Sequence, residues 1–349
     1  MKEEIRLDSG ATQQRVVNRK GWRDFLRALG ILLGLFLLWA AFRGVDFDVV
    51  VASLGKAQPI WLGLSAASVI SSLILKTVRW WILLRPIAPE VGLGQTFGVL
   101  MMGQAGNTLL PSRSGDVARV VLISSSESKR APVILTGIVI EKALDAIFFV
   151  LVAAVVLPGL PAQVANQLDW RTPLAIGSVG LILSFIALML TGAIWRRFRP
   201  LIGRVQWRLG EKLVRLGDQL VQGMEDLRQQ GKFGLVLGLS LLIWLNMAGT
   251  NYLLARALSI PADFRLSSLI LLLAFVAVIP GFMPGHVGVF NYFIRQGLDL
   301  FGVEPNLSAA YSVLLYLLVF IPPILAAGVY LLIQRKTKGL TTRSEGIHG

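Results

Sequence analysis

The segment Gly103–Arg119 reads GQAGNTLLPSRSGDVAR and interrupts a region of the chain that is otherwise apolar. It combines one proline, three glycines, two arginines and one aspartate between the apolar runs 96–102 and 120–123. A helix that breaks inside lipid frees backbone N–H and C=O groups, which need partners in protein or in a watery cavity. Ionisable residues at that depth are costly and by default mark a substrate or ion path. The segment therefore predicts a broken helix with a functional role.

The composition of the whole chain favours a membrane protein. Its 349 residues are 54% hydrophobic and 15% charged, whereas soluble domains carry about 25% charged residues. The formal charge of +14, beside so many apolar runs, indicates contact with anionic lipid and not with nucleic acid. The absence of cysteine excludes disulfides and thiolate metal sites.

Hydropathy predicts six full membrane spans, at residues 26–42, 60–84, 132–157, 174–194, 233–258 and 308–333, the last interrupted by Pro322-Pro323. Two further apolar runs, 96–110 and 266–279, are shorter than the ~20 residues that a span needs. Each of these two runs leads into prolines and glycines. We therefore expect two hairpins of broken helix in addition to the six spans.

Lysine and arginine bias predicts the orientation of the spans. The tail 1–25, the stretch 195–232 and the tail 334–349 are basic and are expected in the cytoplasm. Leucines at three- and four-residue spacing make 195–232 a predicted amphipathic helix on the membrane surface.

With that orientation, both broken hairpins are re-entrant, and they enter from opposite faces of the membrane. Residues 26–157 and 174–333 then form the two halves of an inverted repeat, which is the plan of many transporters. The predicted fold class is an all-α polytopic membrane protein.

The first hairpin carries a candidate anion site. Pro111 would end its first limb, and Ser112 or Ser114 would start a second short helix. The N–H groups of that helix, with Arg113 and Arg119, could hold a phosphate. The alternative is that the arginines and Asp116 only lock the hairpin. We favour binding, because half-helix N-termini at the midplane of transporters face anionic groups.

The candidate substrate-binding residues are Asn107, Pro111, Arg113, Gly115, Asp116, Arg119, Glu141 and Asp145. Glu141 and Asp145 are four residues apart, so both point to one face of their span, and we expect them to line a cavity. Lys76 and Arg79, late in the second span, are expected to extend to the membrane interface.

The second hairpin contains IPGFMPGHVGVFNYF at 279–293 and is expected to form an opposing gate. Its candidate gate residues are Pro280, Gly281, Pro284, Gly285, His286, Gly288 and Asn291. A lone histidine such as His286 is more often a hydrogen-bonded loop residue than a ligand or a proton carrier.

Motifs for common enzyme chemistry are missing from the sequence. There is no P-loop, no G-x-S-x-G, no H-E-x-x-H and no dinucleotide fingerprint. We therefore expect no catalytic residue, no metal and no cofactor, and we do not expect an enzyme.

Three motifs resemble the transmembrane region of lysylphosphatidylglycerol synthases, a flippase-like domain that also occurs alone. They are N-x-x-L-P-x-R-x-G-D-x-x-R from Asn107, I-E-K-x-x-D at Ile140–Asp145 and P-G-x-x-P-G-x-x-G-V-F at Pro280–Phe290. The resemblance implies a lipid-translocating fold in the bacterial inner membrane, and the lysyl-transferring domain of the full synthases is expected to be absent. Two departures stand out: the family has an acid at Asn291 and an arginine at Leu317, which suggests one lost charge pair.

The sequence thus predicts a protein that binds an anionic or phosphate-bearing lipid and moves it between leaflets. One alternative is a membrane subunit or scaffold for a separately encoded lipid-modifying enzyme. A membrane-embedded glycolipid transferase is disfavoured, because no cluster of carboxylates lies at a predicted water interface.

Overall fold

The computed structural model describes residues 32–86, 88–110, 114–124, 131–160, 191–203, parts of 211–228, 229–278 and 284–345. Within these residues every regular element is a helix. Three helical stretches are long and apolar enough to cross a membrane, namely Pro59–Leu84, Phe233–Ala257 and Pro305–Arg335. The all-helical membrane architecture is therefore confirmed in its outline.

The centre of the bundle is the antiparallel pair α3 (Pro59–Leu84) and α11 (Phe233–Ala257). At one end, the Gln58 N–H donates to the Ala257 carbonyl over 2.8 Å. Midway, the Asn246 amide donates to the Ser72 hydroxyl over 2.7 Å and to the Ser68 carbonyl over 2.8 Å. Small polar residues at such a seam let two helices approach closely and bond to each other in lipid.

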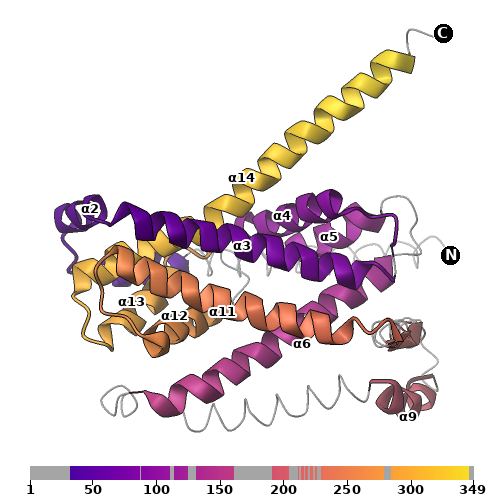
Figure 1. Cartoon of the computed structure of the whole chain (residues 1–349), viewed down its shortest axis with the longest axis horizontal. Helices are drawn as coiled ribbons and strands as arrows, with labels where there is room; N and C mark the ends of the chain where they lie inside the picture. The colour runs from indigo at the N-terminus through magenta and orange to yellow at the C-terminus, as the bar shows by residue number, and fades with distance from the viewer. Residues whose placement is uncertain are drawn as a thin grey trace, which may run out of the picture.

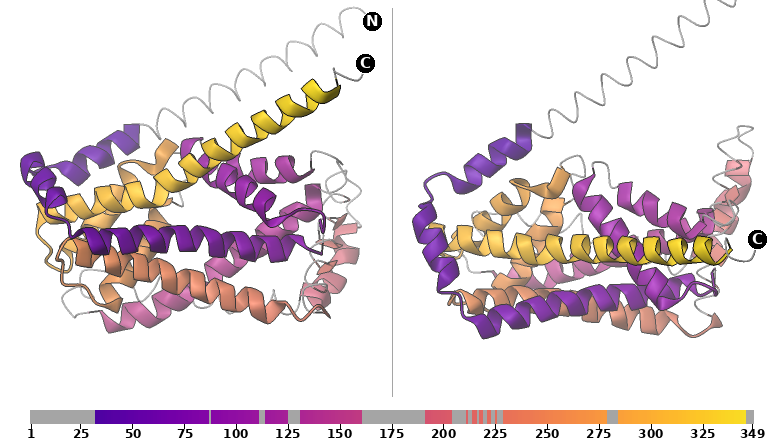
Figure 2. Two further views of the ribbon diagram at one scale, coloured as in Figure 1. Left: turned by 45° about the horizontal axis from the view of Figure 1, so that its top comes forward. Right: turned by 90° about the horizontal axis from the view of Figure 1, so that it is seen from above.

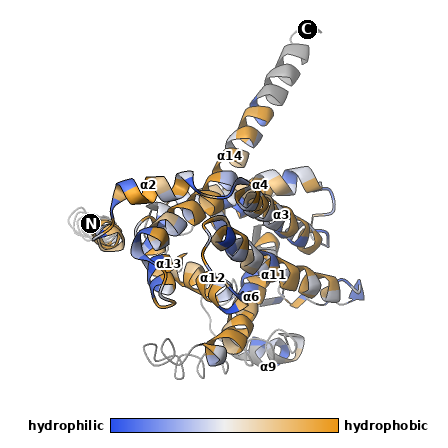
Figure 3. Ribbon diagram, turned by 60° about the vertical axis from the view of Figure 1, so that its left-hand side comes forward, coloured by the Kyte–Doolittle hydropathy of each residue, from blue (hydrophilic) through white to orange (hydrophobic). Residues whose placement is uncertain are grey.

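The outer faces of these two helices are apolar and unpacked. Exposed aliphatic side chains follow one another along both helices, at Ile60, Leu64, Ile70 and Ile74 on α3 and at Leu235, Leu241, Leu242 and Leu245 on α11. Figure 3 shows hydrophobic residues along most of the length of α11 and α6 (Ala131–Val156). A contiguous apolar surface of this kind marks contact with another apolar phase, here the lipid.

The first predicted hairpin is present as α4 (Leu93–Leu109) and α5 (Ser114–Ser124), so the break falls between these two helices, as predicted. The two helices pack closely through glycine. A Cβ atom added at Gly115 would overlap the Gly103 carbonyl oxygen. Only the absence of side chains at such positions allows the backbones to come so near.

The second predicted hairpin is present as α12 (Phe264–Val278), the short η2 (Pro284–His286) and α13 (Val289–Asp299). The two hairpins lie toward opposite ends of the bundle, α4 and α5 near one end and α12 and α13 near the other (Figures 1 and 2). They meet in the interior, where η2 contacts α4.

Polar contacts join neighbouring helices at the end of the bundle that holds α2 (Phe47–Gly55). The Asp46 N–H donates to the Asn306 side chain over 2.9 Å, and Asp46 itself caps α2. Arg295 of α13 donates to the Ala41 and Arg43 carbonyls at the end of the helix Leu32–Phe42. The short η1 (Leu157–Gly159) follows α6 near this end.

The stretch 195–232 is not one amphipathic helix, and this prediction is wrong. Helix α9 (Thr191–Gly203) contributes Trp195, whose indole N–H donates to Asp218 over 2.7 Å. A continuous helix would separate these two residues by about 35 Å. The described parts of the stretch therefore fold back on each other, because Trp195 and Arg199 find a shared carboxylate at Asp218.

The last helix also differs from its prediction. Helix α14 (Pro305–Glu345) runs through Pro322-Pro323 without a break and continues into the predicted basic tail. Prolines are tolerated inside membrane helices, since neighbouring groups and small backbone adjustments satisfy the freed carbonyls. The predicted span 174–194 and the tail 1–25 lie mostly or wholly outside the described residues.

Candidate functional site

The start of α5 is fixed to α4 by a reciprocal pair of hydrogen bonds. The side-chain oxygen Oδ1 of Asn107 accepts from the Asp116 backbone N–H at 3.2 Å, and the side-chain amide N–H of Asn107 donates to the Asp116 carboxylate at 3.1 Å. One of the free N–H groups of the short helix is therefore already satisfied by protein. Asp116 also pairs with Arg119 at 3.5 Å, as the three-residue spacing predicts.

Arg119 of α5 is held by protein through its two terminal nitrogens. It is only 2% exposed, and its two terminal nitrogens face Glu141 of α6 at 2.7 and 3.4 Å. The guanidinium carbon lies 4.0 Å from the centre of the Trp80 ring. A planar guanidinium suits both a bidentate carboxylate and an aromatic face, which a lysine would not. In this arrangement the arginine fork is used to dock α5 onto α6 and α3.

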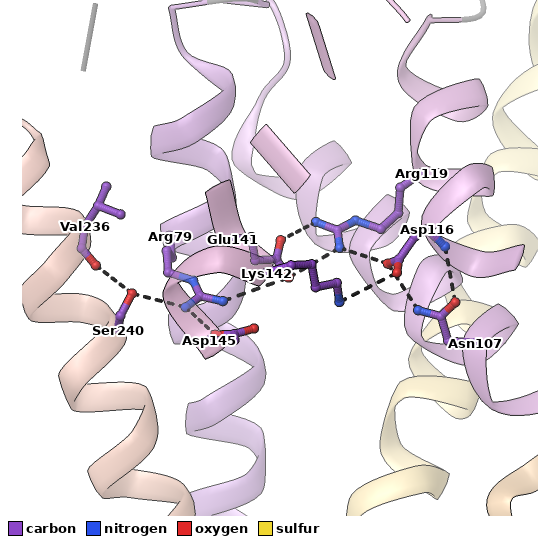
Figure 4. A network of polar contacts seen from close by, with 9 residues as sticks. All are labelled: Arg79, Asn107, Asp116, Arg119, Glu141, Lys142, Asp145, Val236 and Ser240. Atoms are coloured by element: carbon purple, nitrogen blue, oxygen red, sulfur yellow. Dashed lines mark hydrogen bonds and ion pairs between the residues drawn. The ribbon is translucent and has the colours of Figure 1, made fainter. Parts of the chain in front are cut away.

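Arg79 of α3 extends the same network toward α11. It is 1% exposed and donates to Asp145 at 2.8 Å and to the Ser240 hydroxyl at 3.1 Å. A second nitrogen of Arg79 lies 3.9 Å from Glu141. Figure 4 shows a continuous chain of polar contacts from Ser240 on α11, through Arg79 and Glu141, to Arg119 and Asp116 on α5. The expectation that Arg79 extends to the membrane interface is therefore wrong, because buried carboxylates hold it inside the bundle.

A cavity of about 480 Å³ lies beside this network, lined by residues of both hairpins and of α3, α6, α11 and α14. The polar residues of its wall include Ser72, Lys76, Gln104, Asn107 and Asp145. Its apolar residues include Phe149, Phe275, Phe290 and Phe320. Ligand sites of this size are mostly apolar, with a few placed polar groups that fix the orientation of the ligand.

Two lysines line the cavity. Lys142 of α6 has a side chain that is 44% exposed, and its ammonium lies 3.6 Å from Asp116. Lys76 of α3 is in the cavity wall and less exposed. The expectation that Lys76 extends to the membrane interface is therefore also wrong.

The predicted gate residues that are described lie against the cavity and its neighbours. His286 is buried, lines the cavity and has its ring 5.8 Å from the ring of Phe320. The Gly285 carbonyl accepts from the Tyr316 hydroxyl at 2.7 Å, so η2 is tied to α14. Gly288 has φ of 87°, and any side chain there would meet the Gly34 carbonyl.

Asn291 does not face the position with which a lost charge pair was expected. Its amide donates to the Ser312 hydroxyl of α14 at 3.2 Å, inside the core. Leu317 is 46% exposed. Leu317 follows Ser312 by five positions, so its side chain points about 140° around the helix axis from that of Ser312, which contacts Asn291. A buried charge pair between 291 and 317 is therefore not supported by this packing.

The structure brings most of the predicted binding residues together. Asn107, Asp116, Arg119, Glu141 and Asp145 belong to one connected network, of which Asn107, Asp116 and Asp145 also line the cavity. Gly115 lies in the α4–α5 contact. The residues Pro111, Arg113, Pro280 and Gly281 lie outside the described part of the chain.

Sequence reasoning missed Arg79, Trp80, Lys76 and Lys142 as parts of the site. A usable signal was present, since Lys76 and Arg79 are cations three residues apart in an apolar span. Such residues face the interior of a bundle more often than the lipid.

The comparisons with known proteins agree with this architecture. The family described as "Lysylphosphatidylglycerol synthase TM region" matches residues 27–327. A "UPF0104 membrane protein" of Methanothermobacter thermautotrophicus is 25% identical over 310 residues, which cover 84% of this chain and 91% of that protein. "Glycosyltransferase AglD" of Haloferax volcanii is 28% identical over 151 residues, 43% of this chain but only 24% of that protein.

No solved structure matches the chain significantly. The family match nevertheless includes both hairpins, the charged network and the cavity, so it covers the whole candidate site. The chain therefore belongs to the family of lysylphosphatidylglycerol synthase transmembrane regions, and it is a membrane protein.

Proposed function

We propose that this protein binds an anionic or phosphate-bearing lipid in the described cavity and moves its headgroup between the two leaflets. The observation that carries the proposal is the composition of the cavity wall, which combines lysines and amides with phenylalanines. A lipid likewise combines a polar headgroup with apolar chains. A purely water-soluble substrate would leave the phenylalanine wall without a matching surface.

The arrangement of the hairpins supports movement as well as binding. Two broken hairpins that enter from opposite ends and meet beside a cavity are what an inverted repeat of six spans and two re-entrant elements would produce. In this proposal α3, α4–α5 and α6 correspond to α11, α12–α13 and α14. The end of the bundle with α9 is the cytoplasmic end, because its cations include the exposed Arg196 and Arg197.

The anion-binding role of the first hairpin is revised in part. Both terminal nitrogens of Arg119 donate to Glu141, so Arg119 stabilises the wall of the site. In this proposal, other cations bind the headgroup. Arg113 stays a prediction from the sequence.

The proposal is tested by blocking the cavity. Ala274 of α12 lines it, so Ala274→Trp should fill the space that an acyl chain would use. Ala67→Trp on the exposed face of α3 is the matched control, since it adds the same ring outside the cavity. The purified protein is reconstituted in vesicles, and a membrane-impermeant reductant quenches a fluorescent phospholipid headgroup. We expect wild type and Ala67→Trp to expose inner-leaflet headgroups and Ala274→Trp to expose few. Equal rates for all three proteins and for protein-free vesicles would exclude translocation.

A second candidate function is a membrane subunit for a separate lipid-modifying enzyme. The partial match to a much longer protein named as a glycosyltransferase favours it, since that protein combines a related segment with further sequence. In this case co-purification with an enzyme would survive Ala274→Trp, whereas vesicles would show no protein-dependent translocation. In neither proposal does this chain catalyse a reaction itself.

A further inference from the structure

Helix α14 runs along the bundle and packs into two separate hydrophobic cores (Figure 2). Its first part shares a core with the second hairpin, α12–α13, and with the end of α11. Its later part shares a core with the first hairpin, α4–α5, and with the later part of α3. The last α14 residue in the one core is Phe320, and the first α14 residue packed against the other is Ile324. The boundary between the two cores therefore falls on Pro322-Pro323.

The first part of α14 is bound to the second hairpin along one face. Ser312, Tyr316 and Phe320 follow one another at four-residue spacing, so they lie on the same side of the helix. Their hydrogen bonds and ring contacts all reach α13 or η2. The shorter of the two hydrogen bonds runs from the Tyr316 hydroxyl to the Gly285 carbonyl, at 2.7 Å. The first part of α14 and the second hairpin therefore form one packed unit.

The later part of α14 is bound to the first hairpin instead. The Tyr330 ring fills the space beside Gly98 of α4, where an added Cβ atom would overlap the ring. Ala327 is buried in the core that α4 shares with α3. The first hairpin is in turn attached to α6 by the buried pair of Arg119 and Glu141. This part of α14 therefore belongs to a second packed unit, which includes the charged network.

The two adjacent prolines weaken α14 between these units. Because proline has no N–H, the helix lacks the hydrogen bonds from residues 322 and 323 to the carbonyls of Leu318 and Val319. Sharp bends in long helices are almost always located at such residues. The neighbouring helices α3 and α11 have no proline beyond the first residue of α3. Val319 and Phe320 line the cavity, so a bend at the prolines changes the cavity wall.

We propose that Pro322-Pro323 is a hinge, about which the first part of α14 and the second hairpin move together against the rest of the bundle. The inference rests on the proposed function only for the purpose of the motion, which is to open and close the cavity. The moving unit is held to α11 by a neutral bond, from the Tyr311 hydroxyl to the Asn251 carbonyl at 3.1 Å. The ion pairs of the charged network all lie within α3, α5 and α6, so they stay intact when α14 bends.

The hinge is tested by measuring distances on both sides of the prolines. The chain has no cysteine, so spin labels attach only at introduced cysteines. A pair at Val117 of α5 and Leu317 of α14 spans the hinge, whereas a pair at Val117 and Val329 does not, and all three positions are exposed. Double electron–electron resonance on the full chain in lipid nanodiscs should give two populations for the first pair and one for the second. A single narrow population for both pairs would show that α14 moves as one rod and would overturn the hinge.

Proline variants show whether the prolines cause the motion. Pro322→Ala combined with Pro323→Ala supplies the two missing N–H groups and should merge the two populations into one. Pro322→Ala alone supplies one N–H group and should shift the populations in the same direction. Ile321→Ala is the matched control, because it shortens an exposed neighbouring side chain without changing backbone bonds, and it should keep both populations. The double variant should melt no earlier than wild type, since alanine favours a helix far more than proline does. Two unchanged populations in both folded proline variants would overturn the hinge.

The vesicle assay described for Ala274→Trp separates this inference from the proposed function. The double proline variant should lose most of the translocation rate, and Ile321→Ala should keep it. If wild type shows two populations across the hinge but moves no lipid, the hinge stands and the proposed function fails. If wild type moves lipid with a single population across the hinge, the proposed function stands and the hinge is wrong. A full translocation rate in the folded double variant would also overturn the hinge.

Discussion

The two hairpins are anchored by different kinds of interaction, although both are short broken helices packed on a longer one. The α4–α5 hairpin is attached to α6 and α3 through buried charge, with Arg119 bonded to Glu141 and stacked on Trp80. The α12–α13 hairpin is attached to α14 through neutral hydrogen bonds of Asn291 and the Gly285 carbonyl, and its Arg295 reaches only backbone carbonyls outside α13. The charged anchor is costly to disrupt, because removing one partner leaves the other charge buried. The neutral anchor contributes less stability, and removing one of its partners costs less.

This difference assigns separate roles to the two hairpins. Breaking a buried ion pair by removing one partner costs ~3–5 kcal/mol, because the other charge is left in the interior. A neutral hydrogen bond contributes only ~0.5–1.5 kcal/mol net. A hairpin that must move during lipid transport is more easily released from neutral bonds. We therefore expect α4–α5 to be a fixed wall of the cavity and α12–α13 to be its movable side.

The largest effect is expected for Glu141→Gln. Glu141 lies between Arg119 at 2.7 Å and Arg79 at 3.9 Å, so its neutralisation leaves two buried arginines short of a counter-charge. The expected loss in the free energy of unfolding is ~3–5 kcal/mol. Denaturant titration in mixed micelles measures it. The matched change at the anchor of the other hairpin, Ser312→Ala on α14, should cost much less, and equal losses at the two sites would remove the distinction.

Much of this architecture was predictable, because membrane insertion imposes simple constraints. The breaks near Pro111 and after Val278 follow from proline and glycine in short apolar runs. The pairing of Asp116 with Arg119, and the common face of Glu141 and Asp145, follow from helical spacing. These features depend only on neighbours along one helix.

The remaining features depend on contacts between distant segments, which spacing alone does not give. Arg79 is held by Asp145, 66 residues later in the chain, so the sequence of its own helix does not predict this partner. The same holds for Trp195, which meets Asp218 only because the chain turns back between them. Asn291 faces Ser312 and not the Leu317 position, since the rotation of α14 is set by packing of its whole length.

Glycine packing gives a smaller and equally direct comparison between the hairpins. Gly115→Ala in α5 places a methyl group against the backbone of Gly103 and Asn107, which cannot move without shifting α4. Gly297→Ala in α13 meets only the ends of the Leu273 and Ile270 side chains, which can rotate away. We expect Gly115→Ala to cost ~1–3 kcal/mol and Gly297→Ala clearly less. Thermal melting of both variants in one detergent measures this, and a larger loss at Gly297 would contradict it.

Asn291→Ala should have a modest effect on stability. It removes the bond to Ser312 and leaves that hydroxyl still bonded to the Ala309 carbonyl, so no donor is left unsatisfied. The expected loss in the free energy of unfolding is ~1 kcal/mol. The measurement is denaturant titration, with Ser312→Ala for comparison. A loss as large as that of Glu141→Gln would show that Asn291 has a stronger partner than Ser312.

The smallest expected quantity is the coupling between positions 291 and 317. Asn291 is buried against Ser312, and Leu317 is exposed on another side of α14. In a double-mutant cycle of Asn291→Glu and Leu317→Arg, the two losses should add to within ~0.5 kcal/mol, because residues without shared partners are independent.

The same cycle with Arg119→Leu and Glu141→Leu should show strong coupling, since each single change leaves one buried charge and the double change leaves neither. Strong coupling between 291 and 317 would mean that the second hairpin can accept a charge pair after all. The neutral hydrogen bonds of the α12–α13 hairpin would then not be required by the fold. The argument that this hairpin is the movable side of the cavity would lose its physical basis.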